Sequence, residues 1–292
     1  MAPGTTKTIA AGSTRRAVRW LAGLMLMAWI ASPPAFAQHL LAAGPTPPSL
    51  LAEAGQPPTS AKAGASPRHW KIMPFGDSIT RSGCYIARLW RKLRAEPLGD
   101  FDLVGTQGVN GCGEWGVPQR SEGHNCYAIA FVIRPAGTGS LKGCNDGDTF
   151  VGDSRDLVAW FENAQPDIVL WHIGTNDARF RIPLSETLQG YSTVLETLRR
   201  RNPDVVILVA KIVPVVERKT PGIDAAVAAL NAAIPGWAAA NATPRSPIHV
   251  VDMHTGFDPA WMPDGVHPSA DHGAAFMAET WYRALKPVMQ AR

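Results

Sequence analysis

Two short segments contain residues that could carry out nucleophilic catalysis together. In Gly76-Asp77-Ser78-Ile79-Thr80, Ser78 lies directly after an apolar run. A serine hydroxyl is a poor nucleophile unless a base lies within hydrogen-bond reach. In Asp264-Gly265-Val266-His267-Pro268, His267 could accept the serine proton, and Asp264 could hold the other ring nitrogen. The two segments therefore contain the residue types of a Ser-His-Asp triad.

Two further segments could stabilise negative charge on a reacting oxygen. Gly174-Thr175-Asn176-Asp177 follows a second apolar run, and the amide of Asn176 could donate a hydrogen bond into an oxyanion hole. Glu122-Gly123-His124-Asn125-Cys126-Tyr127 could contribute a backbone N–H group. The segments of Ser78 and Asn176 also have a structural interpretation, because Ser, Asn and Asp favour turns and helix caps. A single Asp near a single His, as in Asp264 and His267, is also commonly structural.

The Gly-Asp-Ser motif is not selective by itself. The chain holds a second copy, Gly152-Asp153-Ser154, at the start of a helical stretch around residues 157–161. We interpret this copy as a helix cap. Ser78 differs because it follows a predicted strand.

A metal site is the main alternative for the segment near His267. Asp252, His254 and Asp258 lie close to it in the sequence. They match no recognised zinc spacing, so we expect neither a metal nor another cofactor.

The elements that must position these residues alternate along residues 69–292. The predicted strands are 70–75, 101–104, 167–173, 204–212 and 248–252, and the predicted helices are 84–95, 184–200, 223–240 and 269–285. This alternation predicts an α/β fold, a three-layer α/β/α sandwich with a central parallel sheet of about five strands. In such sheets the working residues lie just past the carboxyl ends of the strands, so the candidate segments should meet at one rim.

One stretch, residues 105–152, shows no clear periodicity and holds three of the four cysteines. We predict a cysteine-tied loop beside the site and assign it no secondary structure. Four cysteines allow three pairings, of which we favour Cys84–Cys112 with Cys126–Cys144. Free buried thiols are the alternative, and a cysteine metal site is disfavoured because no Cys-x-x-Cys pair is present.

The formal net charge of +4 comes from the N-terminus, where residues 1–37 contain four basic and no acidic side chains. The remainder holds 24 basic and 24 acidic residues, so we expect no nucleic-acid partner.

Residues 1–37 also have the basic start, the short apolar run and the Ala35-Phe36-Ala37 ending of a signal peptide. An uncleaved anchor is the alternative, and Sec and twin-arginine export stay equally open.

We therefore expect three parts in the chain. These are a signal peptide at residues 1–37, a disordered Ala/Pro-rich linker at residues 38–68 and a folded domain at residues 69–292. The mature protein should be secreted or periplasmic, with no stable membrane span after cleavage.

Together, the segments resemble the SGNH (GDSL-like) hydrolases, which are named for a Ser, Gly, Asn and His in separated blocks. Residues 71–80 resemble the first block, 166–177 the third and 264–268 the fifth, and the resemblance covers about residues 71–290. The amino-acid sequences of these blocks are most similar to those of carbohydrate esterase family three, whose characterised members include acetyl xylan esterases.

The resemblance implies a role for each matching residue. Ser78 would be the nucleophile, His267 the base and Asp264 its orienting partner, with the Ser78 N–H and the Asn176 amide as oxyanion donors. Related sequences have a glycine where Cys126 aligns, and Gly123 lies three residues earlier. Either of these two residues could supply the third donor.

The function that the resemblance implies is an exported serine esterase that removes acetyl or other small acyl groups from carbohydrate esters such as acetylated xylan. The alternatives are a lipid or aryl esterase of the same fold, or a non-catalytic carbohydrate-binding protein.

Three tryptophans could stack on sugars or pack in the core: Trp115, Trp171 and Trp261. The chain lacks the Gly-x-Ser-x-Gly motif, which argues against an α/β-hydrolase. The sequence leaves the oligomeric state open.

Overall fold

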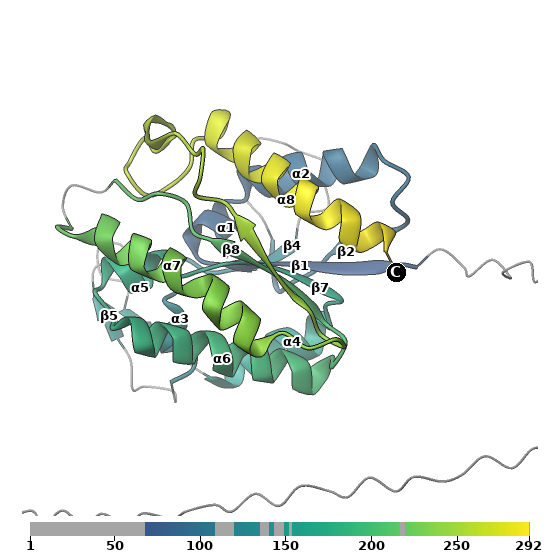
Figure 1. The fold of residues 1–292 in the computed structure, drawn as a ribbon, viewed down its shortest axis with the longest axis horizontal. Coiled ribbons are helices and arrows are strands. Elements are labelled where there is room, and N and C mark those ends of the chain that lie inside the picture. Colours follow the sequence, from purple (N-terminus) through teal and green to yellow (C-terminus); the bar gives the residue numbers. More distant parts are fainter. Residues whose placement is uncertain are drawn as a thin grey trace, which may run out of the picture. The chain divides into compact units, whose positions relative to one another are not determined.

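The described part of the chain is built around one β-sheet in the computed structural model (Figure 1). It comprises residues 68–108, 120–134, 140–142, 149–151, 154–216 and 220–291. The predicted signal peptide, nearly all of the predicted linker, Gly152-Asp153, Trp115, Cys112 and Cys144 lie outside these residues.

The strands, in chain order, are β1 (Trp70–Gly76), β2 (Phe101–Leu103), β3 (Gln107–Gly108), β4 (Arg120–Gly123), β5 (Ser140–Lys142), β6 (Thr149–Val151), β7 (Ile168–His172), β8 (Val206–Lys211) and β9 (Ile248–Asp252). The main sheet has the order β3-β4-β1-β7-β8-β9, and β2 pairs with the first half of β1 on the side where β4 pairs with its end. All of its pairings are parallel except β3–β4, and β5 and β6 form a separate antiparallel pair.

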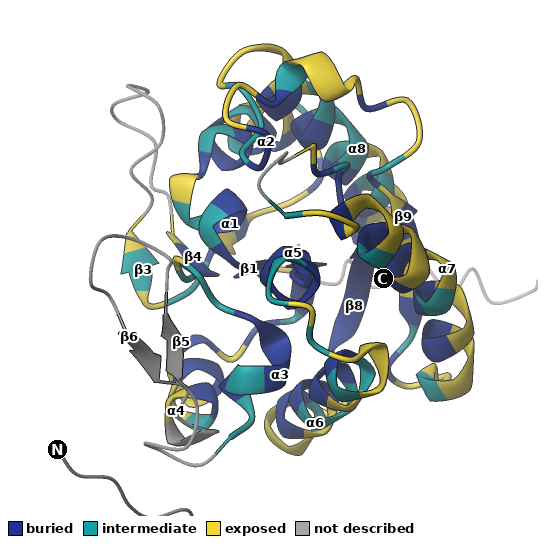
Figure 2. Ribbon diagram, turned by 90° about the vertical axis from the view of Figure 1, so that its left-hand side faces the viewer, coloured by how far each residue is buried: buried dark blue, intermediate teal, exposed yellow. Residues whose placement is uncertain are grey.

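The helices are α1 (Ser78–Ser82), α2 (Cys84–Arg94), α3 (Ile129–Val132), α4 (Ser154–Ala164), α5 (Thr175–Arg179), α6 (Leu184–Arg201), α7 (Ile223–Asn241), the 3-10 helix η1 (Pro259–Trp261) and α8 (His272–Gln290). Side chains of β1 alternate between two cores. Trp70 and Ile72 pack with α2 and α8, whereas Met73 and Phe75 pack with α3, α4, α6 and α7. This period-two alternation explains how one strand supports both helical layers. Strands β1 and β8 are almost entirely buried, while the outer sides of α6 and α7 are exposed (Figure 2).

This arrangement confirms the predicted α/β/α sandwich with a mostly parallel sheet. All five predicted strands and all four predicted long helices are present. The last helix begins at His272 rather than at residue 269, because Ser269 and Asp271 act as caps that accept the N–H groups of Gly273 and His272.

The stretch from residue 105 to 152 differs from the prediction, which assigned it no secondary structure. It contains β3, β4, α3, β5 and β6. β4 escapes a search for apolar alternation because its sequence is Arg-Ser-Glu-Gly, yet Ser121 and Glu122 are fully buried. Hydrogen bonds hold the polar side chains of this strand instead of apolar packing: Glu122 accepts from Thr106, and Ser121 accepts from the N–H of Gly123.

The strand order creates a switch point between β1 and β7. The connection after β1 leads to β2 and β4 on one side of β1, and the connection after β7 leads to β8 on the other side. In open parallel sheets ligands bind at such a point, beyond the carboxyl ends of the two strands. Ser78 follows β1 and Asn176 follows β7, so the fold places both candidates there.

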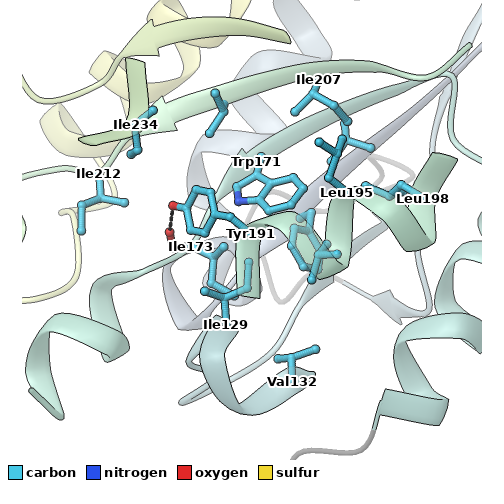
Figure 3. Packing of buried hydrophobic residues seen from close by; sticks show 14 of the residues in the cluster. Ile129, Val132, Trp171, Ile173, Tyr191, Leu195, Leu198, Ile207, Ile212 and Ile234 are labelled. Carbon is cyan, nitrogen blue, oxygen red and sulfur yellow. Dashed lines mark hydrogen bonds between the residues drawn. The ribbon is translucent and has the colours of Figure 1, made fainter. Parts of the chain in front are cut away.

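The core beneath this point is aromatic. Trp171 of β7 has no exposed surface and contacts Phe75 and Trp237. It also contacts Tyr191, which lies beside it in Figure 3. Trp171 is therefore a core residue and cannot stack on a sugar. The hydroxyl of Tyr191 donates to the carbonyl of Ile173 at 2.6 Å, which fixes the end of β7 just before the Asn176 segment.

Helix α7 is the one helix of the described residues that is long and apolar enough to cross a membrane. Its apolar side chains Val227, Leu230 and Ile234 are buried in the core formed with β7 and β8. Packing on the sheet thus accounts for its composition.

Candidate active site

Ser78, His267 and Asp264 form one continuous chain of hydrogen bonds. Nε2 of His267 lies 2.8 Å from Oγ of Ser78. Nδ1 of His267 lies 2.6 Å from Oδ2 of Asp264. When Nδ1–H donates to the Asp264 carboxylate, Nε2 is left as an acceptor for the serine hydroxyl. The structure thus brings together the three residues that the sequence singled out for a triad.

Gly76 lets the chain turn sharply from β1 into α1. It pairs with Gly123 of β4 and with His172 of β7. A Cβ atom on Gly76 would lie 2.3 Å from the His172 carbonyl oxygen and 2.3 Å from Oγ1 of Thr80. Only glycine fits this close approach, and the turn makes Ser78 the first residue of α1.

Asp77 caps the short helix that carries Ser78. It has no exposed surface, and its Oδ1 accepts the N–H of Ile79 at 3.0 Å. Burial raises the pKa of Asp77 to about 6, against the opposing effect of this hydrogen bond. Asp77 therefore holds the turn in place, while the carboxylate next to His267 is that of Asp264.

The loop that carries His267 is shaped by Asp264. Oδ1 of Asp264 accepts the backbone N–H groups of Val266 at 2.9 Å and His267 at 2.7 Å. Partial burial acts to raise the pKa of Asp264, but the hydrogen bonds from His267 and Val266 outweigh it and hold the pKa below its ordinary value. Gly265 has a φ of +86°, and its carbonyl accepts the N–H of Val216, which fastens the loop to the segment after β8.

Asn176 lies in α5, directly after the strand next to β1. Its side chain is 2% exposed, and Nδ2 donates to the carbonyl of Tyr127 at 3.1 Å. This bond uses one of the two N–H donors of the amide and fixes the direction of the other. Asn176 is thereby joined to the segment that contains Cys126.

Asp177 is a structural residue that sequence reasoning passed over. Its buried carboxylate accepts the N–H groups of Ile129 at 2.9 Å and Ala130 at 3.1 Å, and the hydroxyl of Thr187 at 3.3 Å. Burial raises the pKa of Asp177 to about 6, although these hydrogen bonds lower it. The carboxylate anchors α3, and so the segment before it, to the loop that carries Asn176.

Gly123 and Cys126 differ in how they fit the role of a third donor. The N–H of Gly123 donates to Oγ of Ser121 at 3.3 Å, and a Cβ on Gly123 would lie 2.5 Å from the backbone nitrogen of Arg81. Cys126 has a φ of +65°, the left-handed conformation that glycine adopts most easily. This conformation disfavours a residue with a Cβ, so glycine would suit the position better than Cys126 does.

Cys84 and Cys126 are both disulfide-bonded in the structure. Cys112 and Cys144 lie outside the described residues, so the favoured pairing stays a prediction.

The acidic and histidine residues considered for a metal have other partners. Asp252 binds Lys211 and Thr255, the imidazole of His254 contacts Asn231, and Asp258 caps η1. Within the described ranges, no group of three or more His, Cys, Asp or Glu residues could hold a metal ion.

The family follows from a match to a family model. The model of the GDSL-like Lipase/Acylhydrolase family matches residues 75–272, which is more than half of the chain. The chain belongs to this family. It is therefore an ester hydrolase of the SGNH type, and the resemblance drawn from the sequence is confirmed.

Solved structures place this SGNH chain near carbohydrate esterases. It is similar to a mutant acetyl esterase solved with an acetate ion (27% identity, TM-score 0.62), with 76% of this chain and 99% of that chain covered. A carbohydrate esterase family 3 structure from Talaromyces cellulolyticus gives 28% identity, a TM-score of 0.62 and the same coverage. A family 3 carbohydrate esterase from Clostridium thermocellum, at 24% identity and a TM-score of 0.59, supports the fold; 77% of this chain and 98% of that one are covered. No curated protein matches the chain.

Proposed function

We propose that this SGNH hydrolase is an exported serine esterase that removes small acyl groups, acetyl above all, from carbohydrate esters such as acetylated xylan. The observation that carries the proposal is the hydrogen-bonded chain Ser78–His267–Asp264 at the switch point of the sheet. A non-catalytic carbohydrate-binding role would leave this geometry without a purpose.

The proposed reaction is acyl transfer to water through an acyl-enzyme. Nε2 of His267 takes the Ser78 proton while Oγ attacks the ester carbonyl, and Asp264 stabilises the imidazolium that forms. His267 then protonates the leaving alcohol as the tetrahedral intermediate collapses. A water molecule, deprotonated by His267, attacks the acyl-enzyme and releases the acid and free Ser78.

The oxyanion would be held by three donors on neighbouring elements. The Ser78 N–H opens α1, where helix N–H groups have no partner within the helix. The Asn176 amide follows β7, and we assign the third donor to the N–H of Cys126. Gly123 fits this role less well because its N–H already donates to Ser121.

The choice of substrate rests on the similar structures and on the reaction type. The two structures at 27% and 28% identity are described as an acetyl esterase and a carbohydrate esterase of family 3. Trp261 of η1 is only partly buried and lies three residues before Asp264. Of the tryptophans considered for stacking on a sugar, its ring is therefore the one we propose.

Acetate release from acetylated xylan by the wild type and by Ser78→Ala tests the function. We expect release by the wild type and near-background release by the variant. The matched control is Ser154→Ala, which alters the second Gly-Asp-Ser copy and should keep full activity. Wild-type activity in purified Ser78→Ala protein would overturn the assignment. Faster turnover of long-chain than of acetyl esters would instead favour a lipid esterase.

Export and disulfide pairing need their own measurements. Expression of the full chain in a bacterium that exports proteins, followed by N-terminal sequencing, should give a product that begins at Gln38. Mass spectrometry of unreduced peptides should show the pairs Cys84–Cys112 and Cys126–Cys144. A product that keeps residues 1–37 would argue for an N-terminal anchor.

A further inference from the structure

A buried carboxylate–imidazole pair lies in the segment beside the candidate oxyanion hole. Nε2 of His124 and Oε1 of Glu122 are joined by a 2.6 Å hydrogen bond, and Glu122 has no exposed surface. Thr106 donates to the same carboxylate from its hydroxyl at 2.6 Å and from its backbone N–H at 2.8 Å. The three donors give the oxygens of this buried carboxyl group hydrogen-bond partners, without which its burial would be costly. The proposed acyl transfer uses neither Glu122 nor His124 as a reactant.

Aromatic contacts fix the plane of the His124 ring. The imidazole stacks on Tyr127 with ring centres 4.5 Å apart, and on Trp160 of α4 with ring centres 4.2 Å apart. Only 11% of the His124 side chain is exposed, and Trp160 belongs to the core. The ring therefore cannot turn without disturbing either the buried carboxylate or the core.

The backbone of His124 connects this cluster to the oxyanion donors. Its N–H donates to the carbonyl of Gly76, two residues before Ser78, and its carbonyl accepts the N–H of Tyr127. The second bond closes the turn 124–127, which contains Cys126, and the first ties that turn to the end of β1. The carbonyl of Tyr127 then accepts the amide of Asn176.

We propose that His124 is a positioning residue for acyl transfer, which rests on the proposed function of Ser78. Held by Glu122 and stacked on Tyr127 and Trp160, it sets the turn 124–127 so that the Cys126 N–H and the Asn176 amide meet the same oxygen. Oxyanion donors must lie within about 2.7–3.1 Å of the developing charge. A displacement of about 1 Å can cost roughly 10²-fold in rate.

Two substitutions at His124 separate its two kinds of contact. His124→Phe keeps a ring for stacking but removes the bond to Glu122, and His124→Gln keeps a donor but removes the ring. The matched control is His69→Phe, because Nε2 of His69 also binds a carboxylate, that of Asp102 at 2.9 Å, but its side chain is 51% exposed.

The readouts are kcat and KM for p-nitrophenyl acetate and the inhibition constant of a trifluoromethyl ketone. This ketone adds to a serine hydroxyl and places an oxyanion in the hole. We expect His124→Phe to lower kcat by about 10²-fold, the usual cost of a misplaced group, and to weaken ketone binding in proportion. KM should stay nearly unchanged, and His69→Phe should behave as the wild type in all three measurements.

Further outcomes separate the two proposals. Active Ser78→Ala protein would overturn the proposed function. Inactive Ser78→Ala protein together with wild-type kcat in both His124 variants would overturn the positioning role alone. A fall in kcat without weaker ketone binding would overturn it too, because the loss would then not lie in the oxyanion hole. If His124→Phe fails to fold, as judged by circular dichroism, His124→Gln decides the matter by the same measurements.

Discussion

The side chains of His267 and Ser78 meet at 2.8 Å although 189 residues separate them in the chain. Two local devices make this contact possible. Gly76 allows β1 to turn at once into α1, and Asp264 folds the loop 264–267 around its own carboxylate. The turn at Gly76 and the loop at Asp264 each depend on residues next to a catalytic candidate. The sheet then brings Ser78 and His267 together. This division explains why short motifs far apart in the sequence can define one site.

The amide of Asn176 should act mainly in the transition state. Asn176→Asp keeps the shape of the side chain but replaces the N–H donors by an acceptor. We expect kcat to fall by about 10²–10³-fold, the usual cost of one lost oxyanion donor, with little change in KM. Steady-state kinetics on p-nitrophenyl acetate measure both constants.

Asn202→Asp is the matched control for this prediction. The amide of Asn202 also donates to a backbone carbonyl, that of Pro166 at 2.9 Å, but it lies before the amino end of β8, whereas the site lies beyond the carboxyl ends of the strands. Its kcat should equal that of the wild type. Equal losses in the two variants would show that Asn176 acts only on stability.

Much of this fold and site could be predicted because the signals are local. The apolar runs of β7 and β8 and the helical spacing in α6 and α7 identify these elements directly. Ser78 follows β1, Asn176 follows β7 and His267 precedes α8. β4 could not be predicted, since its buried side chains are the polar Ser121 and Glu122, and the partners of Glu122 come from Thr106 and His124. The anchoring role of Asp177 could not be predicted either, because the N–H groups that donate to its carboxylate lie 47 and 48 residues away in the chain.

Cys126 tests whether the left-handed turn matters more than the sulfur atom. Cys126→Gly and Cys126→Ala both remove the disulfide, but only alanine keeps a Cβ at a φ of +65°. The left-handed conformation costs roughly 1–2 kcal/mol for a residue with a Cβ. We expect Cys126→Gly to keep the higher kcat and the higher melting temperature of the two. Identical values for both variants would contradict a requirement for this backbone conformation.

The hydroxyl of Tyr191 should stabilise the end of β7. Tyr191→Phe leaves the buried carbonyl of Ile173 without this donor, which typically costs about 1–3 kcal/mol. We expect a lower melting temperature and a lower kcat, because Gly174 and Asn176 follow directly. Tyr282→Phe is the control, since its hydroxyl binds Glu96 and Lys286 away from the site. A Tyr191→Phe variant as stable as the wild type would contradict this role.

The buried carboxyl of Asp77 should make stability depend on pH. Its pKa is raised from 3.8 to about 6 in the folded protein, so the folded state binds more protons than the unfolded state between these two values. Stability from this group is therefore present below pH 4 and is lost as the pH rises through 6. The melting temperature of Asp77→Asn relative to the wild type should accordingly increase from pH 4 to pH 7. Asp252→Asn is the control, because the pKa of Asp252 is lowered to about 2, so its contribution to stability is not lost as the pH rises through 6. A difference between Asp77→Asn and wild type that stays flat from pH 4 to pH 7 would show that Asp77 is not held in a strongly desolvated state.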